Sequence, residues 1–216
     1  INFKVNETII LQDKFKNQIA ELKVKKIENV NLEKHLKYLS QSNDYFYKLF
    51  KIRDNYLISG KLNLLYKEGK FPFKNYLTPK QFRYIAYQKN WKNIIAFHTR
   101  NLPHKGHLEL QKIALEQLHI DGLYINPFIY NKKFGDFKTS FVYKSYENLI
   151  ENKYYKNKAI LSFFLNYPRF LGPREAIFSA ICRQNIGCNY FIVGRDHSGL
   201  GKKYNALDLI KLFKKF

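Results

Sequence analysis

Two histidines and an arginine follow an apolar segment near the middle of the chain. Residues 93–97 read Asn-Ile-Ile-Ala-Phe, and the polar loop after them contains Arg100, His104 and His107 before an amphipathic stretch begins. In a parallel α/β sheet, phosphates bind where a buried strand ends and a helix starts. Because His104 and His107 are three positions apart in the first helical turn, both imidazoles can face a triphosphate. Ordinary pairs of surface histidines show the same spacing, so it needs support from elsewhere in the chain.

A second segment of the same kind lies nearer the C-terminus. Residues 172–176, Gly-Pro-Arg-Glu-Ala, open a helical stretch. The largely apolar residues 188–193 follow, and the glycine-rich loop 194–201, Gly-Arg-Asp-His-Ser-Gly-Leu-Gly, comes directly after them. This order predicts a helix, a buried strand and a second polar loop, again at the carboxyl end of a strand.

These segments, in this order, resemble the catalytic domain of the ATP sulfurylase (sulfate adenylyltransferase) family. Members of that family carry a Gln-Thr-Arg-Asn-Pro loop with an HxxH pair, then Gly-Pro-Arg-Glu-Ala, then Gly-Arg-Asp-His-Ala-Gly. The likeness is strong over residues 76–207 and weak over residues 1–75. It implies a nucleotidyltransferase of sulfate assimilation, which binds ATP and converts ATP and sulfate into adenylyl sulfate and diphosphate.

The resemblance also implies roles for individual residues of the two loops. Catalytic positions fall on residues of the first loop, namely Thr99, Arg100, Asn101, His104 and His107. ATP binding falls on residues of the second loop, namely Gly194, Arg195, Asp196 and His197. Sulfate contacts fall on His98, Arg100 and Ser198. Ser198 replaces an alanine whose backbone N–H binds sulfate in the family, and serine keeps that N–H.

Some positions depart from the family pattern. His98 stands where a glutamine usually contacts sulfate, and Leu102 stands where a proline follows the asparagine. A neutral imidazole can donate one hydrogen bond, so His98 either keeps the contact or adds pH dependence near neutrality. It also fits a site for another oxyanion, or a lost activity. Before Gly172, Arg169 is the cation that matches the family's Met-Arg-Tyr-Ala segment.

The implied reaction joins two anions, because a sulfate oxygen attacks the α-phosphorus of ATP. Sulfate is already deprotonated and needs no general base, so catalysis should come from positioning and from cations that face the phosphates. Arg100 can bind sulfate through its planar fork, and Arg195 offers a second fork. We expect Mg²⁺ to enter bound to ATP, with no tightly bound cofactor and no metal held by the protein.

The composition is that of a globular protein. Its 216 residues are 45% hydrophobic, enough for one good-sized core or two modest ones. No apolar run approaches the roughly 18 residues of a membrane span, and no secretory signal is visible, so we expect a cytoplasmic protein. The chain begins with Ile1 and contains no Met, which suggests a fragment that lacks both natural ends. Cys182 and Cys188 are expected to be reduced core thiols.

The net charge of +21 raises a different class of function, a non-catalytic nucleic-acid-binding module. The lysines are spread along the whole chain rather than clustered, which favours a solvated surface, and we do not expect nucleic acid as a partner. A second alternative is a nucleotidyltransferase with another acceptor, because HxGH loops serve many of them. We expect a homo-oligomer.

Two regions differ in pattern. Residues 1–75 are β-rich, with two short strands around Asp13 and a hairpin over 55–65, and resemble the later part of a PUA-like domain followed by a linker. In residues 76–216, helices alternate with buried strands near 93–98, 122–126, 159–164 and 189–194, and Thr78-Pro79 should start a helix over 80–89. This pattern predicts a Rossmann-like nucleotidyltransferase domain with a parallel sheet, truncated at its C-terminal end.

Overall fold

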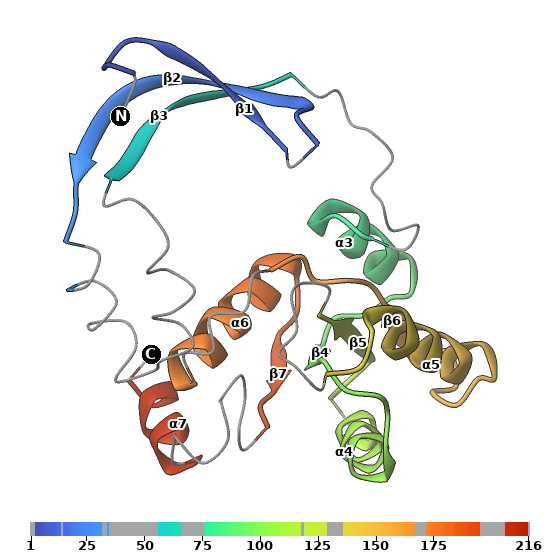
Figure 1. Ribbon diagram of the computed structural model, residues 1–216. Helices are drawn as coiled ribbons and strands as arrows, with labels where there is room; N and C mark the ends of the chain where they lie inside the picture. The colour runs from blue at the N-terminus through green and yellow to red at the C-terminus, as the bar shows by residue number, and fades with distance from the viewer. Residues whose placement is uncertain are drawn as a thin grey trace. The chain divides into compact units, whose positions relative to one another are not determined.

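The computed structural model describes residues 3–13, 15–31, 34, 56–65, 76–117, 119–128, 136–166, 172–194 and 206–215 (Figure 1). The chain divides into two compact units, Ile1–Pro72 and Phe73–Phe216. Each unit has a sheet of its own.

The first unit contains an antiparallel sheet of β1 (Thr8–Gln12), β2 (Gln18–Asn29) and β3 (Tyr56–Leu64), in the order β1-β2-β3. The turn expected around Asp13 is confirmed. The Asp13 carboxylate accepts hydrogen bonds from the backbone N–H groups of Phe15 (2.8 Å) and Asn17 (3.0 Å), and it thereby closes the β1–β2 connection.

The hairpin expected over residues 55–65 is wrong, because β3 is one continuous strand that pairs with β2. Gly60 lies in the middle of β3 and not in a turn. A side chain there would come within 2.0 Å of the Lys23 carbonyl oxygen, beside an irregularity in the register between Val24 and Lys26. The glycine therefore allows a close approach of two backbones.

The second unit alternates strands and helices. Its parallel strands are β4 (Ile94–Thr99), β5 (Gly122–Pro127), β6 (Ala159–Leu161) and β7 (Tyr190–Ile192). Its described helices are α3 (Pro79–Gln88), α4 (Lys105–Glu116), α5 (Thr139–Glu151), α6 (Pro173–Ile186) and α7 (Ala206–Phe213). The expected alternation and parallel sheet are confirmed. The helix expected from Thr78 is also present, and Thr78 and Gln81 form a reciprocal capping box at its start.

The strand order among the described residues is β6-β5-β4-β7. The chain first moves outward from β4 through β5 to β6, and α6 then returns it to the other side of β4. Doubly wound sheets reverse direction in this way, and they bind ligands in the crevice beyond the carboxyl ends of the strands at the reversal point. Here that point lies between β4 and β7, which precede the two polar loops.

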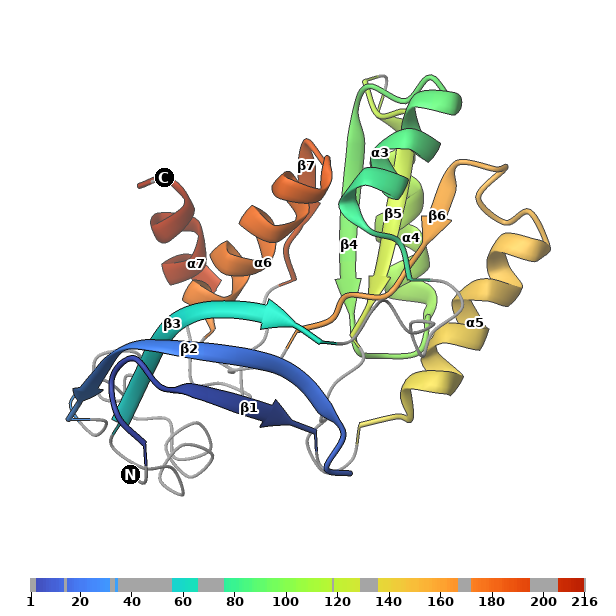
Figure 2. The same cartoon turned by 90° about the horizontal axis from the view of Figure 1, so that it is seen from above.

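Two apolar clusters cover the two faces of the sheet, because successive residues of a strand point to opposite faces. Ile94 and Ala96 of β4 pack on the face covered by α3, whereas Phe97 packs on the face covered by α5. In Figure 2, α3 lies in front of β4 and β5, and α4 lies behind them. The alternation places His98 on the face of Ala96, and Thr99 on the face of Phe97.

The second unit contains both cysteines of the chain. Cys188 is buried and Cys182 is partly buried, and neither takes part in a disulfide bond. Within the described residues, no helix combines the length and the apolar character needed to cross a membrane.

Candidate active site at the carboxyl ends of β4 and β7

The first loop begins with a buried threonine. The Thr99 hydroxyl accepts a hydrogen bond from the Asn101 backbone N–H (3.1 Å) and lies 3.3 Å from the Asn101 carbonyl oxygen. The Thr99 carbonyl accepts from the Phe128 backbone N–H (2.9 Å), which links the end of β4 to the end of β5. These bonds fix the loop backbone at the place where Arg100 leaves the sheet.

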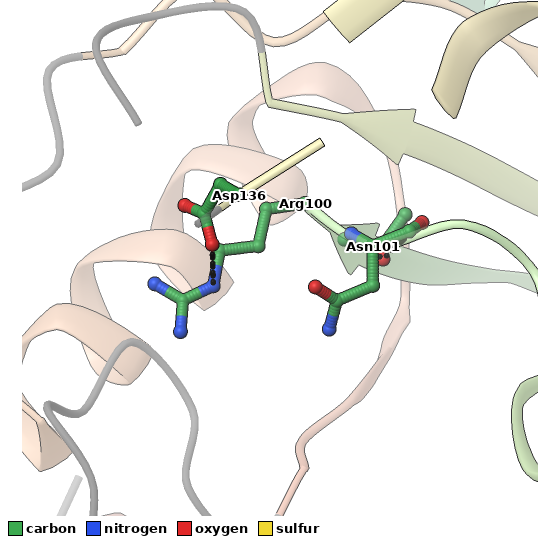
Figure 3. Close-up of polar contacts among 4 residues, drawn as sticks. Arg100, Asn101 and Asp136 are labelled. Atoms are coloured by element: carbon green, nitrogen blue, oxygen red, sulfur yellow. Dashed lines mark hydrogen bonds and ion pairs between the residues drawn. The ribbon is translucent and has the colours of Figure 1, made fainter. Parts of the chain in front are cut away.

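Arg100 lies beside a buried carboxylate. Its Nε atom is 3.9 Å from Oδ1 of Asp136, just before α5 (Figure 3). The Arg100 side chain is 26% exposed and the Asp136 side chain 7%. In Figure 3 the guanidinium of Arg100 and the amide of Asn101 extend to the same side of the loop. This carboxylate lies at ion-pair distance from the Nε edge, so it orients the planar fork through the attraction of opposite charges.

The two histidines of the HxGH segment lie against each other. The rings of His104 and His107 stack with centroids 3.8 Å apart and 29° between their planes. Gly106 leaves room for this arrangement, because a side chain there would lie 3.2 Å from the His104 ring. The prediction that both imidazoles share one side of the first turn of α4 is confirmed.

The charge state of His107 is biased toward neutrality. Burial lowers the pKa of His107 below its ordinary value, and the neighbouring His104 lowers it further, while the Leu102 backbone acts in the opposite direction. The His107 ring also packs edge-on against Phe97, with centroids 5.1 Å apart. A neutral imidazole near an unoccupied anion site can accept a proton when negative charge arrives.

His98 lies on the opposite face of β4 from Thr99. Its Nδ1 is 3.0 Å from the Asn126 backbone oxygen and 2.7 Å from a terminal nitrogen of Arg183. The rings of Phe128 and Phe164 flank it, with centroid distances of 5.1 Å and 5.9 Å. The structure therefore brings His98 to the same carboxyl edge as Arg100, but with a different set of neighbours.

The second loop starts beside the first. Because Ile192 of β7 pairs with Phe97 of β4, Gly194 follows at the same edge of the sheet. A side chain at Gly194 would meet nothing within 4 Å. The remaining predicted residues of this loop, and the cation before Gly172, lie outside the described residues: Arg195, Asp196, His197, Ser198 and Arg169.

Sequence reasoning missed two polar residues of the site, Asp136 and Arg183. The pairing of Asp136 with Arg100 joins distant positions of the chain, so no local spacing indicates it. Arg183 had a detectable signal, because it continues the series Ala176, Ser179 at helical spacing on the buried side of α6. An arginine at a core position of that kind requires a partner.

The described part of the site offers cations and hydrogen-bond donors to an anion. Among the residues that the structure describes, no three His, Cys, Asp or Glu side chains are arranged to hold a metal ion. Electrostatic stabilisation by positioned cations is the chemistry that such a site can supply.

Comparisons with known proteins identify the family of this chain. A family model described as ATP-sulfurylase matches residues 74–216. A sulfate adenylyltransferase of Pyrococcus abyssi is 40% identical over 193 residues, which cover 83% of this chain and 50% of that protein. The enzyme of Ignicoccus hospitalis is 44% identical over 170 residues, covering 78% of this chain and 44% of its own length. The chain thus spans about half the length of these curated relatives.

A solved structure of a hexameric APS kinase from Thiobacillus denitrificans is similar in fold. It aligns with a TM-score of 0.63 at 17% identity, over 91% of this chain and 35% of the other. At that identity the likeness concerns the fold alone. The family model and the curated relatives together establish that the chain belongs to the ATP-sulfurylase family.

Proposed function

We propose that the protein is a sulfate adenylyltransferase, which converts Mg-ATP and sulfate into adenylyl sulfate and diphosphate. The observation that carries this proposal is the first loop. In a chain of the ATP-sulfurylase family, this loop places Arg100 and the stacked pair His104 and His107 at the carboxyl end of β4. The loop lies at the reversal point of the sheet, where such folds bind ligands.

In the proposed reaction a sulfate oxygen attacks the α-phosphorus of ATP, and the bond to the β-phosphate bridging oxygen breaks. Diphosphate leaves with the electron pair of that bond, and no proton has to be removed from sulfate. Arg100 binds and orients the sulfate, because a guanidinium held along its Nε edge matches an oxyanion with its remaining donors. Asp136 fixes that orientation.

His104 and His107 face the phosphates as negative charge develops on them. The lowered pKa of His107 keeps it neutral in the unliganded site, which avoids repulsion between two stacked imidazolium rings. Negative charge that develops around the α-phosphorus raises the proton affinity of the His107 ring, so its stabilising effect grows toward the transition state.

ATP is proposed to lie across the crevice between β4 and β7, with Gly194, Arg195, Asp196, His197 and Ser198 around the nucleotide and the sulfate. Mg²⁺ arrives as part of the substrate Mg-ATP. The strand order β6-β5-β4-β7 supports a Rossmann-like nucleotidyltransferase domain. We further propose that the first unit is a PUA-like remnant, that the protein is cytoplasmic, and that it forms homo-oligomers.

The test is diphosphate release from Mg-ATP by the full-length protein, with and without sulfate. Release should require sulfate and should be lost in Arg100→Ala. A parallel screen with selenate and phosphate covers the second candidate function, an enzyme for another oxyanion, which the replacement of the family's glutamine by His98 favours. Release that requires only one of these other anions would reassign the acceptor. A nucleic-acid-binding module would instead bind DNA in a salt-dependent way that Arg100→Ala leaves unchanged.

A further inference from the structure

A buried cation lies behind the acceptor side of the site. Arg183 of α6 has an exposed fraction of 0%. Its guanidinium lies 3.7 Å above the Phe164 ring, and one terminal nitrogen donates to the Ser179 carbonyl (3.1 Å). Burial lowers the pKa of Arg183 to about 10, so the group still carries its charge at neutral pH.

The other terminal nitrogen of Arg183 lies 2.7 Å from Nδ1 of His98. A guanidinium has donors and no acceptor, so Nδ1 must present its lone pair to this contact. A neutral imidazole with a lone pair on Nδ1 carries its proton on Nε2. The Asn126 carbonyl oxygen, 3.0 Å from the same Nδ1, would be satisfied by the opposite tautomer, with the proton on Nδ1. The two neighbours therefore favour opposite states of the ring.

We propose that Arg183 is a positioning residue, which fixes His98 as a neutral Nε2–H donor for the acceptor anion. The shorter contact and the permanent charge of Arg183 decide the competition with the Asn126 carbonyl. The second half of this statement, the donation to the acceptor, rests on the proposed function. The first half, the tautomer, does not depend on it.

In this state, His98 offers the anion one N–H donor, as the side-chain amide of the family's glutamine would at the same position. Without Arg183, Nδ1 would donate to the Asn126 carbonyl, and Nε2 would turn a lone pair toward an oxyanion. Acidification below about pH 6.5, the ordinary histidine pKa, would then restore a donor by protonating the ring. Sulfate binding should therefore gain an additional pH dependence in variants that lack Arg183.

Other ionisable groups packed around Arg183 do not mimic this response. Tyr124 of β5, Glu175 and Cys182 of α6, and Cys188 before β7 all interact electrostatically with Arg183. Burial raises the pKa of Tyr124 far above neutrality and that of Cys188 to about 12. All of these groups, like His104 and His107, are also present in the His98→Gln background. A pH response that Arg183→Met causes only when His98 is present therefore belongs to His98.

The direct test is nitrogen NMR of the full-length protein labelled with ¹⁵N-histidine, in which His98→Gln assigns the His98 signals. The expected result is a protonated Nε2 and an unprotonated Nδ1 at pH 7.5, changed in Arg183→Met and restored in Arg183→Lys. Arg83→Met is the matched control. Arg83 lies on α3 and donates to the Asn185 and Ile186 carbonyls at the end of α6, the helix that carries Arg183, and neither of these hydrogen bonds involves His98. A protonated Nδ1 in the unaltered protein would overturn the proposal without the need for any variant.

The kinetic test compares KM for sulfate in two backgrounds. In Arg183→Met, the His98 ring would no longer donate its Nε2–H to the sulfate anion. The loss of this hydrogen bond to a charged partner should raise KM for sulfate about tenfold to a hundredfold at pH 8. The rise should be smaller at pH 6, and KM for ATP should change little. In the His98→Gln background the same substitution should have little effect. An equal rise in both backgrounds would overturn the proposal, since Arg183 would then act through the fold. A protein with the expected tautomer and no sulfate-dependent reaction would refute the proposed function while leaving the tautomer intact.

Discussion

Two arginines near the carboxyl end of β4 lie in opposite environments. Arg100, in the loop after β4, is partly exposed and lies beside the Asp136 carboxylate. On the face of Ala96, Arg183 is buried against Phe164 and contacts an imidazole. An exposed cation can meet a ligand directly and needs only orientation. A buried cation cannot reach the ligand, so its effect must pass through a residue that can.

The largest effect should come from the exposed arginine. Arg100→Ala should lower kcat/KM for sulfate by about 10²–10³, the loss typical of one positioned donor to developing charge. Thermal stability should fall as well, because the buried Asp136 carboxylate loses its neighbouring cation. Arg100→Lys should recover only part of the rate, since an ammonium cannot reproduce the planar fork. Unchanged steady-state kinetics in Arg100→Ala would show that the exposed arginine does not contact the sulfate.

The carboxylate that orients Arg100 should come next. Asp136→Asn keeps the size of the side chain and removes the charge, so the guanidinium should lose its preferred orientation. We expect kcat/KM to fall about tenfold to a hundredfold, because small displacements at a reacting centre are costly. The effect should vanish in the Arg100→Ala background. A double-mutant cycle on kcat/KM measures this coupling, and additive losses would mean that Asp136 acts independently of Arg100.

The pH dependence of stability should report the stacked histidines. The folded-state pKa of His107 is lowered, mainly by burial, so its contribution to stability is fully present above the unfolded value of about 6.5. That contribution is lost as the pH falls through the folded pKa, because the unfolded chain then binds more protons. Urea unfolding between pH 5 and pH 8 should show this loss, and His107→Phe should reduce it. An unchanged profile in His107→Phe would assign the acid sensitivity to other groups.

The smallest effect on activity should come from Gly106→Ala, which reduces the room beside the stacked histidines. Gly106→Ala adds a methyl group 3.2 Å from the His104 ring, so the ring has to shift by a few tenths of an ångström. We expect a several-fold lower kcat with little change in KM for sulfate. Helix stability should rise slightly, because alanine favours a helix more than glycine does. Steady-state kinetics and thermal melting together check this, and a faster variant would contradict a role for the stack.

Local patterns predicted the sheet and the loops at its edge well. The apolar runs before His98 and before Gly194 form β4 and β7, and each is followed by the expected polar loop. Local patterns failed where the reason lay in a distant segment. Gly60 resembled a turn residue, but its role depends on the β2 backbone that approaches it.

The site shows the same limit. The pairing of Arg100 with Asp136, and of His98 with Arg183, joins residues separated by one or more crossovers of the chain. Sequence spacing within a loop could indicate that His104 and His107 share one side of a helical turn. It could not indicate which group would hold each arginine, since that depends on how helices pack on the two faces of the sheet.

The most direct measurement is identification of the nucleotide product formed from Mg-ATP and sulfate, by anion-exchange chromatography, beside the amount of diphosphate released. The account predicts one adenylyl sulfate for each diphosphate in the unaltered full-length protein, and a loss of both products in Arg100→Ala. Diphosphate formed without adenylyl sulfate, or the same yield of adenylyl sulfate from Arg100→Ala, would contradict it.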